Sequence, residues 1–563
     1  IVFMEGMTGR LFREFSLVVA GAVIISAFSA LTFTPMLATK LLIKREKQSW
    51  FYAKTEPFFE GMNRLYSRSL AAFLGKRWIA LPFTFITICL IGILWNAVPA
   101  EMAPLEDRSQ ISINTRGAEG VTYEYIRDYT EDINQLVDSI LPDAEAVTAR
   151  VSSGSGNVRI TLKDMNERNY TQMDVAEKIS KAVQKKTMAR SFVQQQSSFG
   201  GRRGSMPVQY VLQATNLEKL EEVLPKFMAK VYENPVFQMA DVDLKFSKPE
   251  ARIQINRDKA SIMGVSTKNI AQTLQYGLSG QRMGYFYMNG KQYEILGEIN
   301  RQQRNKPADL KAIYVRSSSG DMIQLDNLIE LESGIAPPKL YRYNRFVSAT
   351  ISAGLADGKT IGQGLDEMDK IAKETLDDTF RTALSGDSKE YRESSSSLMF
   401  AFILAILLIY LILAAQFESF KDPLIIMLTV PLAIAGALVF MYFGDITMNI
   451  FSQIGIIMLI GLVAKNGILI VEFANQKQEA GEDKMSAIKD AALQRLRPIL
   501  MTSASTVLGL IPLAFASGEG ANQRIAMGTA VVGGMVVSTL LTMYIVPAIY
   551  SYISTNRIKI TKE

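Results

Sequence analysis

The chain has 563 residues, of which 48% are apolar, with no histidine and a single cysteine, Cys89. This composition excludes a disulfide within the chain, a Cys or His metal site, and a serine nucleophile activated by histidine. The formal charge of +6 is compatible with nucleic-acid binding, but the excess lysine and arginine lies in short connections between apolar stretches, where membrane topology accounts for it.

Seven stretches are each long and apolar enough to cross about 30 Å of hydrocarbon. They are 15–39, 78–100, 394–417, 423–444, the run 446–471 that one lysine interrupts, 498–518 and 525–556. A polar block, 101–393, separates the second stretch from the third. The sequence therefore predicts a polytopic α-helical membrane protein with seven transmembrane helices and one large polar domain.

Basic residues in short connections predict which side of the membrane each connection occupies. The stretch 40–77 has nine basic and three acidic residues, and the tail 557–563 is also basic. Counting spans from either one places 101–393 on the outer side of the membrane, so the two anchors agree. Aromatic and basic residues alternate along 40–77, which is typical of an amphipathic helix on the inner leaflet.

The first residues, 1–14, are then expected to lie outside as a short stub. Ile1–Met4 are apolar, no initiating methionine precedes them, and they resemble the end of a helix. We therefore expect further transmembrane helices upstream.

The polar block alternates between strand and helix patterns and predicts two α+β units. The first unit has strands at 109–116 and 157–162 and helices at 122–140 and 172–185. The second has strands at 207–213, 241–245, 251–255 and 346–353 and helices at 217–232 and 361–376. Between the last two strands of the second unit, 255–280 is predicted to be helical and 285–298 to be a hairpin around Asn289-Gly290. A smaller module is thus inserted into the second unit.

Two glycine-containing motifs in this block have structural explanations. Gly354–Thr360 (GLADGKT) lies between a strand and a helix, but three residues separate its glycines where a phosphate-binding loop has four. Ser152–Asn157 (SSGSGN) places serines among glycines without any histidine to activate them. Neither motif predicts catalysis.

Lys465 lies inside the fifth stretch, and burying its ammonium near the bilayer centre costs about 2.5 to 3.5 kcal/mol. Residues one helical turn away, such as Gly461 and Leu469, cannot compensate the charge, and Glu472 is about 10.5 Å along the axis. The other carboxylates of the last 170 residues, Asp422 among them, fall in connections or the tail. A partner from elsewhere is expected. The alternative is that Lys465 snorkels to the cytoplasmic interface, although the midpoint of the run is only about 6 Å away.

Several motifs in this chain resemble those of resistance-nodulation-division efflux pumps, in the hydrophobe/amphiphile branch. They are FTPMLATKLL (33–42), INRDKASIMGVSTKNI (255–270), LYRYNRF (340–346), GLVAKNGILIVEFA (461–474), RLRPILMTS (495–503) and GTAVVGGMV (528–536). Their order resembles the C-terminal half of such a pump.

The resemblance implies a proton-driven antiporter of the bacterial inner membrane that needs no cofactor. It implies a homotrimer, joined to the upstream half of the pump, a periplasmic adaptor and an outer-membrane channel, which exports small amphiphilic compounds from the periplasm and bilayer. Lys465 would pair with acidic residues of an upstream helix, and Arg495 and Thr502 would belong to the same proton relay.

By position, the resemblance also divides the periplasmic domain into ferredoxin-like subdomains of βαβ type. Residues 101–205 would form one pore-type subdomain, 206–250 with 339–393 a second, and 251–338 an inserted docking subdomain. The last five transmembrane helices would occupy 394–556.

The chain departs from the multidrug pumps of this family between residues 146 and 165, where it has no aromatic residue and a shortened loop. The next stretch offers Phe192, Phe199, Gln194 and Gln196 as substrate contacts, or forms a flexible loop. Three hypotheses remain: an exporter of amphiphilic compounds; an exporter of a narrower substrate that is lipid-like, small and polar, or a metal ion; and a non-transporting scaffold or sensor.

Overall fold

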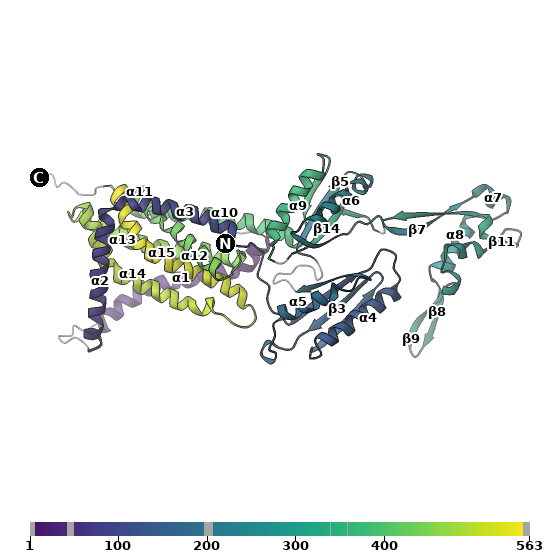
Figure 1. Cartoon of the computed structure of the whole chain (residues 1–563), viewed down its shortest axis with the longest axis horizontal. Helices are drawn as coiled ribbons and strands as arrows, with labels where there is room; N and C mark the ends of the chain where they lie inside the picture. The colour runs from purple at the N-terminus through teal and green to yellow at the C-terminus, as the bar shows by residue number, and fades with distance from the viewer. Residues whose placement is uncertain (1–5, 42–49, 196–205, 338, 357, 556–563) are drawn as a thin grey trace.

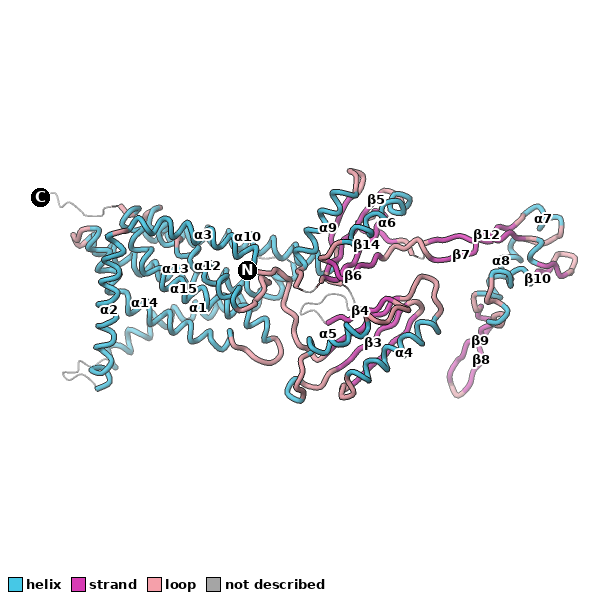
Figure 2. The backbone as a smooth tube through the Cα atoms, in the orientation of Figure 1, coloured by secondary structure: helices cyan, strands magenta, loops and turns pink. Residues whose placement is uncertain are grey.

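The computed structural model of the chain describes residues 6–41, 50–195, 206–337, 339–356 and 358–555. It has two parts, a bundle of long helices and an α/β region that extends from one end of the bundle (Figure 1). Figure 2 shows the strands β1 to β15 in the α/β region.

Within the described ranges, seven helical spans are long and apolar enough to cross a membrane, which confirms the predicted number. The bundle helices are α1 (Gly6–Leu41), α3 (Ala80–Ala97), α10 (Gly386–Phe417), α11 (Lys421–Met427), α12 (Thr429–Phe443), α13 (Ile450–Glu479), α14 (Lys484–Ala514) and α15 (Ala521–Ile553), with α11 and α12 forming one span. Helix α1 begins at Gly6, so the described part of the predicted stub is helical. Phe12 fixes this first part by packing its ring 5.5 Å from that of Phe451.

Small residues allow the central helices of the bundle to approach closely. Ala526, Ala530, Gly534 and Ser538 recur every four residues on α15, and all are buried. A Cβ atom at Gly534 would lie 2.9 Å from the carbonyl oxygen of Ala433 on α12. Such a stripe serves packing between membrane helices, where small side chains let backbones meet.

Helix α2 (Trp50–Gly75) lies across the end of the bundle that is farther from the α/β region (Figure 1). The Tyr66 hydroxyl donates a hydrogen bond of 2.6 Å to the Met543 carbonyl, and Glu56 pairs with Arg497 of α14 at 3.0 Å. A short 3-10 helix, η1 (Arg77–Ile79), joins α2 to α3.

The first α/β unit, which we call unit 1 (residues 107–195), is a four-stranded antiparallel sheet with two helices on one face. Its elements are β1 (Gln110–Arg116), α4 (Tyr123–Ile140), β2 (Ala146–Ser152), β3 (Ser155–Thr161), η2 (Met165–Glu167), α5 (Gln172–Val183) and β4 (Arg190–Gln195), with the strand order β2-β3-β1-β4. The predicted strands do not include β2 or β4. Val147, Ala149 and Val151 of β2 alternate with polar residues, a pattern typical of a strand, whereas β4 ends in glutamines.

Unit 2 repeats this arrangement and carries an insertion. Its elements are β5 (Val208–Ala214), α6 (Leu217–Glu233), β6 (Phe237–Val242), β13 (Tyr341–Tyr343), β14 (Phe346–Leu355), α9 (Ile361–Thr375) and β15 (Arg381–Leu384). Strand β14 pairs with both β5 and β6, and β15 pairs with the other edge of β5. The strand predicted at 241–245 begins earlier, at Phe237, and ends at Val242.

The inserted module lies at the end of a two-stranded ribbon that projects from unit 2 (Figure 2). It comprises β7 (Lys248–Ile255), α7 (Arg257–Ile262), α8 (Thr267–Leu278), β8 (Gln281–Met288), β9 (Lys291–Gly297), η3 (Arg301–Gln303), η4 (Pro307–Ala312), β10 (Tyr314–Arg316), β11 (Met322–Gln324), η5 (Leu325–Asn327) and β12 (Ile329–Ala336). The single helix predicted over 255–280 is wrong. Gly264, with φ of +64°, separates α7 from α8.

The two glycine motifs have structural roles. Gly154, with φ of +79°, lies in the tight turn between β2 and β3. Thr360 caps α9, because its hydroxyl accepts a hydrogen bond from the Gln363 N–H while the Gln363 side chain accepts one from the Thr360 N–H.

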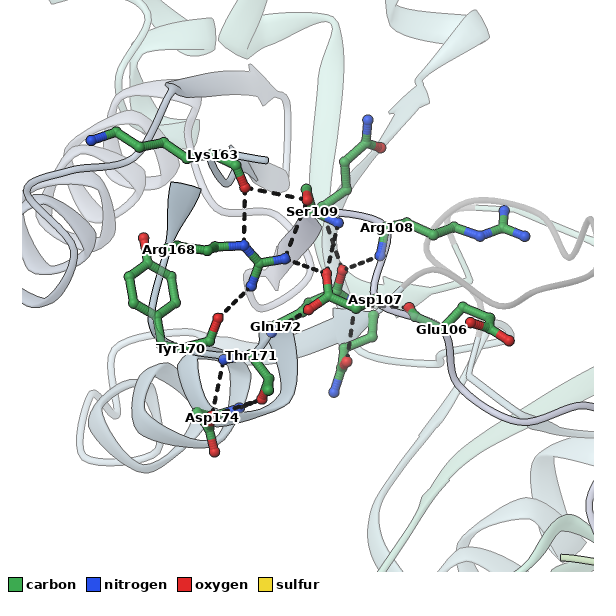
Figure 3. Close-up of polar contacts among 12 residues, drawn as sticks. Glu106, Asp107, Arg108, Ser109, Lys163, Arg168, Tyr170, Thr171, Gln172 and Asp174 are labelled. Carbon is green, nitrogen blue, oxygen red and sulfur yellow. Dashed lines mark hydrogen bonds and ion pairs between the residues drawn. The ribbon is translucent and has the colours of Figure 1, made fainter. Parts of the chain in front are cut away.

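Unit 1 begins at a buried ion pair between Asp107 and Arg168 (Figure 3). The Arg168 side chain is completely buried, and its guanidinium lies 2.5 Å from the Asp107 carboxylate. Burial raises the pKa of Asp107, but hydrogen bonds from Arg168 and from the backbone of Gln172 and Ser109 outweigh it, so the pKa lies below its ordinary value of 3.8.

This ion pair predicts a pH-dependent stability of unit 1. A lowered pKa in the folded state stabilises the fold above pH 3.8, and the contribution is lost as the pH falls through the folded pKa. Asp107→Asn is expected to lower the opening free energy of β1 by about 3 kcal/mol at neutral pH, because Arg168 stays buried without its partner. Hydrogen exchange of β1 amides in the whole protein measures this. The difference in β1 opening free energy between Asp107→Asn and the unaltered protein should shrink below pH 3.8. The substitution Asp138→Asn, at an exposed position, should change this free energy little at any pH.

Candidate functional site

Lys465 lies near the middle of α13, on a side of the helix that the rest of the bundle does not cover. Its neighbours Ala464 and Asn466 are buried, whereas Lys465 itself is exposed. One turn earlier, a Cβ atom at Gly461 would meet no atom within 4 Å. The charged side chain therefore points away from the helices of this chain.

Among the residues that the structure describes, no hydrogen bond or ion pair involves the Lys465 side chain. This agrees with the absence of acidic residues one turn away in the sequence. Lys465 and Gln476 are exposed and Glu472 is half-buried, so the described helices leave the polar residues on this side of α13 at least partly uncovered. Within a membrane, an uncovered ammonium needs a partner or water.

The structure places Thr502 closer to Lys465 than Arg495. The bond between Asn466 and Ser503 sets α13 and α14 level at those residues. Thr502 therefore lies within one helical turn of the level of Lys465, and its hydroxyl donates to the Ile499 carbonyl of its own helix at 3.2 Å. Arg495 lies eight residues before Ser503, about 12 Å along the helix axis.

Arg495 contacts α13 at Phe473, about two turns beyond Lys465. Its guanidinium carbon is 4.4 Å from the centroid of the Phe473 ring, a cation–π contact. Its Nε atom is buried and has no hydrogen-bond partner among the described residues. Because a buried N–H group rarely stays unpaired, Arg495 has a donor available for a group that joins this surface.

A buried polar triangle lies beside Lys465, and sequence reasoning did not predict it. The Asn466 amide nitrogen donates to the hydroxyls of Ser503 and Thr539, each at 3.3 Å, and the two hydroxyls are 3.0 Å apart. These contacts join α13, α14 and α15 at one level. The available signal was a polar asparagine directly after Lys465 within an apolar run.

Two of the four predicted substrate contacts lie within the described residues. Phe192 and Gln194 are on β4, an edge strand, and they alternate with Val193, which packs toward the core under α4 and α5. They therefore lie on the face of the unit 1 sheet that carries no helix. Gln196 and Phe199 lie outside the described residues.

Hydrogen-bonded amide side chains cross this open sheet face, which also carries Arg116, Arg150, Arg159 and Arg190. Asn114 donates to Gln194 at 3.1 Å and accepts from Asn157 at 2.8 Å, so three strands carry a continuous amide ladder. Phe192 is the one aromatic side chain on β4. This face is suited to polar contacts more than to aromatic stacking.

Comparison with known proteins identifies the family. Residues 1–554 match the family model described as AcrB/AcrD/AcrF family. The chain belongs to this family of resistance-nodulation-division transporters. It is also 31% identical over 571 aligned residues to a protein of Haemophilus influenzae described as an uncharacterized transporter, with 99% of the chain and 55% of that protein covered. The chain thus spans about half the length of this relative.

Membership of the family confirms the resemblance seen in the sequence motifs. The protein is a multi-pass membrane protein of a transporter family. In the part of the chain that the structure describes, no group of three or more His, Cys, Asp and Glu residues is arranged to hold a metal ion.

A second polar cluster lies near the α2 end of the bundle of this transporter. Asp422, which the sequence placed in a connection, is completely buried in the first turn of α11. It accepts a hydrogen bond of 3.1 Å from Asn475, which accepts one of 2.6 Å from the Tyr550 hydroxyl. Gln478 donates to the same hydroxyl at 2.6 Å. The cluster joins α11, α13 and α15, so it holds α13 in one rotation about its axis.

Proposed function

We propose that this chain is part of a proton-driven antiporter that exports small amphiphilic compounds. The observation that carries the proposal is Lys465, a cation in the middle of a membrane helix that no described residue of the chain neutralises. Ionisable residues at this depth mark ion pathways, and family membership makes transport the process that would use one. We infer that acidic residues on an upstream helix supply the partner.

The proton would act by changing the charge that Lys465 faces. Protonating the partner carboxylates removes the attraction that holds the lysine, and the helix contacts then rearrange. Asn466 follows Lys465 and bonds to α14 and α15, so a shift of α13 is passed to both helices. One proton crossing about 150 mV carries roughly 3.5 kcal/mol, enough for a gradient of a few hundredfold.

Arg495 and Thr502 are proposed as further members of the relay. Thr502 lies within one helical turn of the level of Lys465 on the neighbouring helix, where its hydroxyl can exchange the Ile499 carbonyl for another acceptor. Arg495 has a buried Nε donor that lacks a described partner. Both residues would complete their hydrogen bonds with the upstream half.

The proposed setting is the bacterial inner membrane, with the α/β region in the periplasm. The basic stretch 40–77 supports this orientation, because α2 lies at the opposite end of the bundle from the α/β region. In this proposal the ferredoxin-like units 1 and 2 are the pore-type subdomains and the module on its ribbon is the docking subdomain. Three copies would assemble with a periplasmic adaptor and an outer-membrane channel.

A narrower, more polar substrate is the second candidate. The amide ladder of Asn114, Asn157 and Gln194 supports it, because amides recognise polar groups by hydrogen bonds. A broadly binding pocket gains most of its affinity from apolar and aromatic side chains.

The experiment is proton-coupled transport by the complete transporter, this chain with its upstream half, reconstituted in liposomes that contain a pH-sensitive dye. Ethidium and the anionic amphiphile taurocholate serve as probes. Either probe should accelerate proton flow down an imposed pH gradient, and a protonophore should stop its export. Acceleration of proton flow by taurocholate but not by ethidium would favour the narrower substrate range. Export that survives the protonophore would contradict the proposal.

A further inference from the structure

A short connecting segment, residues 98–109, leads from α3 to unit 1 and is attached to the bundle at two places. We call it the strap. Its first part pairs with the connection between α12 and α13, where the Met448 N–H donates to the Pro99 carbonyl at 2.7 Å and the Glu101 N–H donates to the Met448 carbonyl at 3.0 Å. The start of the strap is therefore held by bundle helices other than α3.

The second attachment of the strap is to the first turn of α15. The Glu106 carboxylate accepts a hydrogen bond of 3.0 Å from the Gln523 N–H, and the Asn522 amide donates one of 2.7 Å to the Leu105 carbonyl. The N-cap residue of α15 is Gly520, which has no side chain to cap the helix. Glu106, 417 residues away in the chain, supplies the missing cap, and its negative charge suits a helix N-terminus.

Asp107, the next residue, points to unit 1 (Figure 3). Its carboxylate binds the buried guanidinium of Arg168 and also accepts hydrogen bonds from the N–H groups of Gln172, at 2.9 Å, and Ser109, at 3.1 Å. The buried Gln172 side chain in turn accepts from the N–H groups of Arg108 and Gln110. Asp107 thereby attaches the strap to α5 and to the loop that precedes it.

The carboxylates of these two consecutive residues therefore join the helix bundle to unit 1. Glu106 is 3% exposed and holds α15, whereas Asp107 holds unit 1. Consecutive Cα atoms are about 3.8 Å apart across a trans peptide, so the connection has almost no slack. A longer, solvated linker would absorb a helix shift through its own backbone dihedral angles.

Helix α15 also reaches the level of Lys465. Its Thr539 bonds to Asn466, the residue that follows Lys465. It is one continuous helix of 33 residues that contains both Gln523, where Glu106 binds, and Thr539. Close backbone contacts at Gly528 and Gly534 pack it tightly against its neighbours. A shift at the lysine can therefore reach the strap along a single rigid element.

We propose that Glu106 and Asp107 form the joint through which α15 moves unit 1 when the charge around Lys465 changes. This inference rests on the proposed function and names the positioning residues that it would need. Neither carboxylate binds a proton or substrate in this role. They transmit a displacement, which requires only that each keeps its own partner.

The test is a double-mutant cycle read by hydrogen exchange of the β1 amides, in the complete transporter in lipid nanodiscs. Lys465→Ala is expected to change β1 exchange by about fivefold or more in the otherwise unaltered transporter, the lower end of typical coupling between sites. In the Glu106→Ala background the same substitution should leave β1 exchange nearly unchanged. Glu106→Gln keeps an acceptor oxygen for Gln523 and should restore most of the response.

Two more variants separate coupling from folding. Glu131→Ala, on the exposed face of α4, should keep the full response. Asn522→Ala removes the other contact at an exposed position and should weaken the response even if Glu106→Ala fails to fold. If Lys465→Ala changes β1 exchange as much in the Glu106 and Asn522 variants as in the unaltered transporter, the proposed joint is excluded.

Transport measured on the same Lys465→Ala protein separates the two proposals. If transport is lost while β1 exchange is unchanged, the joint is overturned and the proposed function stands. If transport is unaffected, the proposed function fails, and the joint fails with it.

Discussion

Lys465→Ala is expected to abolish proton-coupled export by the complete transporter while leaving it folded. Lys465 makes no hydrogen bond or ion pair with any residue that the structure describes, so its loss costs this half of the bundle little. Its proposed partners would keep a buried negative charge without compensation, a cost of about 3 kcal/mol, or roughly a hundredfold in an equilibrium. The carboxylates would then hold their protons throughout the cycle. Proton flux into dye-loaded liposomes measures the effect.

The matched control for this prediction is Lys421→Ala, which removes the same charge from an exposed position at the start of α11. It should export at the rate of the unaltered protein. Lys465→Arg keeps the charge but changes its shape, and is expected to fall between the two. Normal export by a folded Lys465→Ala protein would exclude the proposed mechanism.

Gly528→Ala is expected to destabilise the bundle strongly. A Cβ atom at this position would lie 2.6 Å from the backbone nitrogen of Ala514 and 2.8 Å from the carbonyl carbon of Leu513. Both atoms belong to the backbone at the end of α14, so no side-chain rotation relieves the clash and the two helices must move apart. Overpacking of this kind costs about 1 to 3 kcal/mol. Thermal unfolding of the purified protein in detergent should show a clear decrease in Tm.

Gly509→Ala provides the comparison within α14. A Cβ atom there meets no atom within 4 Å, and alanine favours a helix over glycine by about 1 kcal/mol. We expect its Tm to be equal to or above that of the unaltered protein. Equal decreases in both variants would show that helix propensity, and not the close approach at Gly528, accounts for the effect.

The sequence alone predicted the membrane spans, the family and the lysine within the fifth span. Each depends on information that is local along the chain. An apolar run long enough to cross the hydrocarbon core is recognised from its own residues, without information about neighbouring helices. The lack of an acidic residue one turn from Lys465 follows from helical spacing, and the family motifs are continuous segments. The two α+β units also followed from local patterns, apart from β2, β4, β13 and β15.

The tertiary structure decided which polar residues meet. Asn466, Ser503 and Thr539 lie on three helices, and no spacing rule links them. Asp422 is in a connection by sequence but is buried, because α13 and α15 cover it with Asn475 and Tyr550. Glu106 caps a helix that begins hundreds of residues later. Such contacts depend on how whole helices pack, whereas spans and motifs depend on residues that are neighbours in the chain.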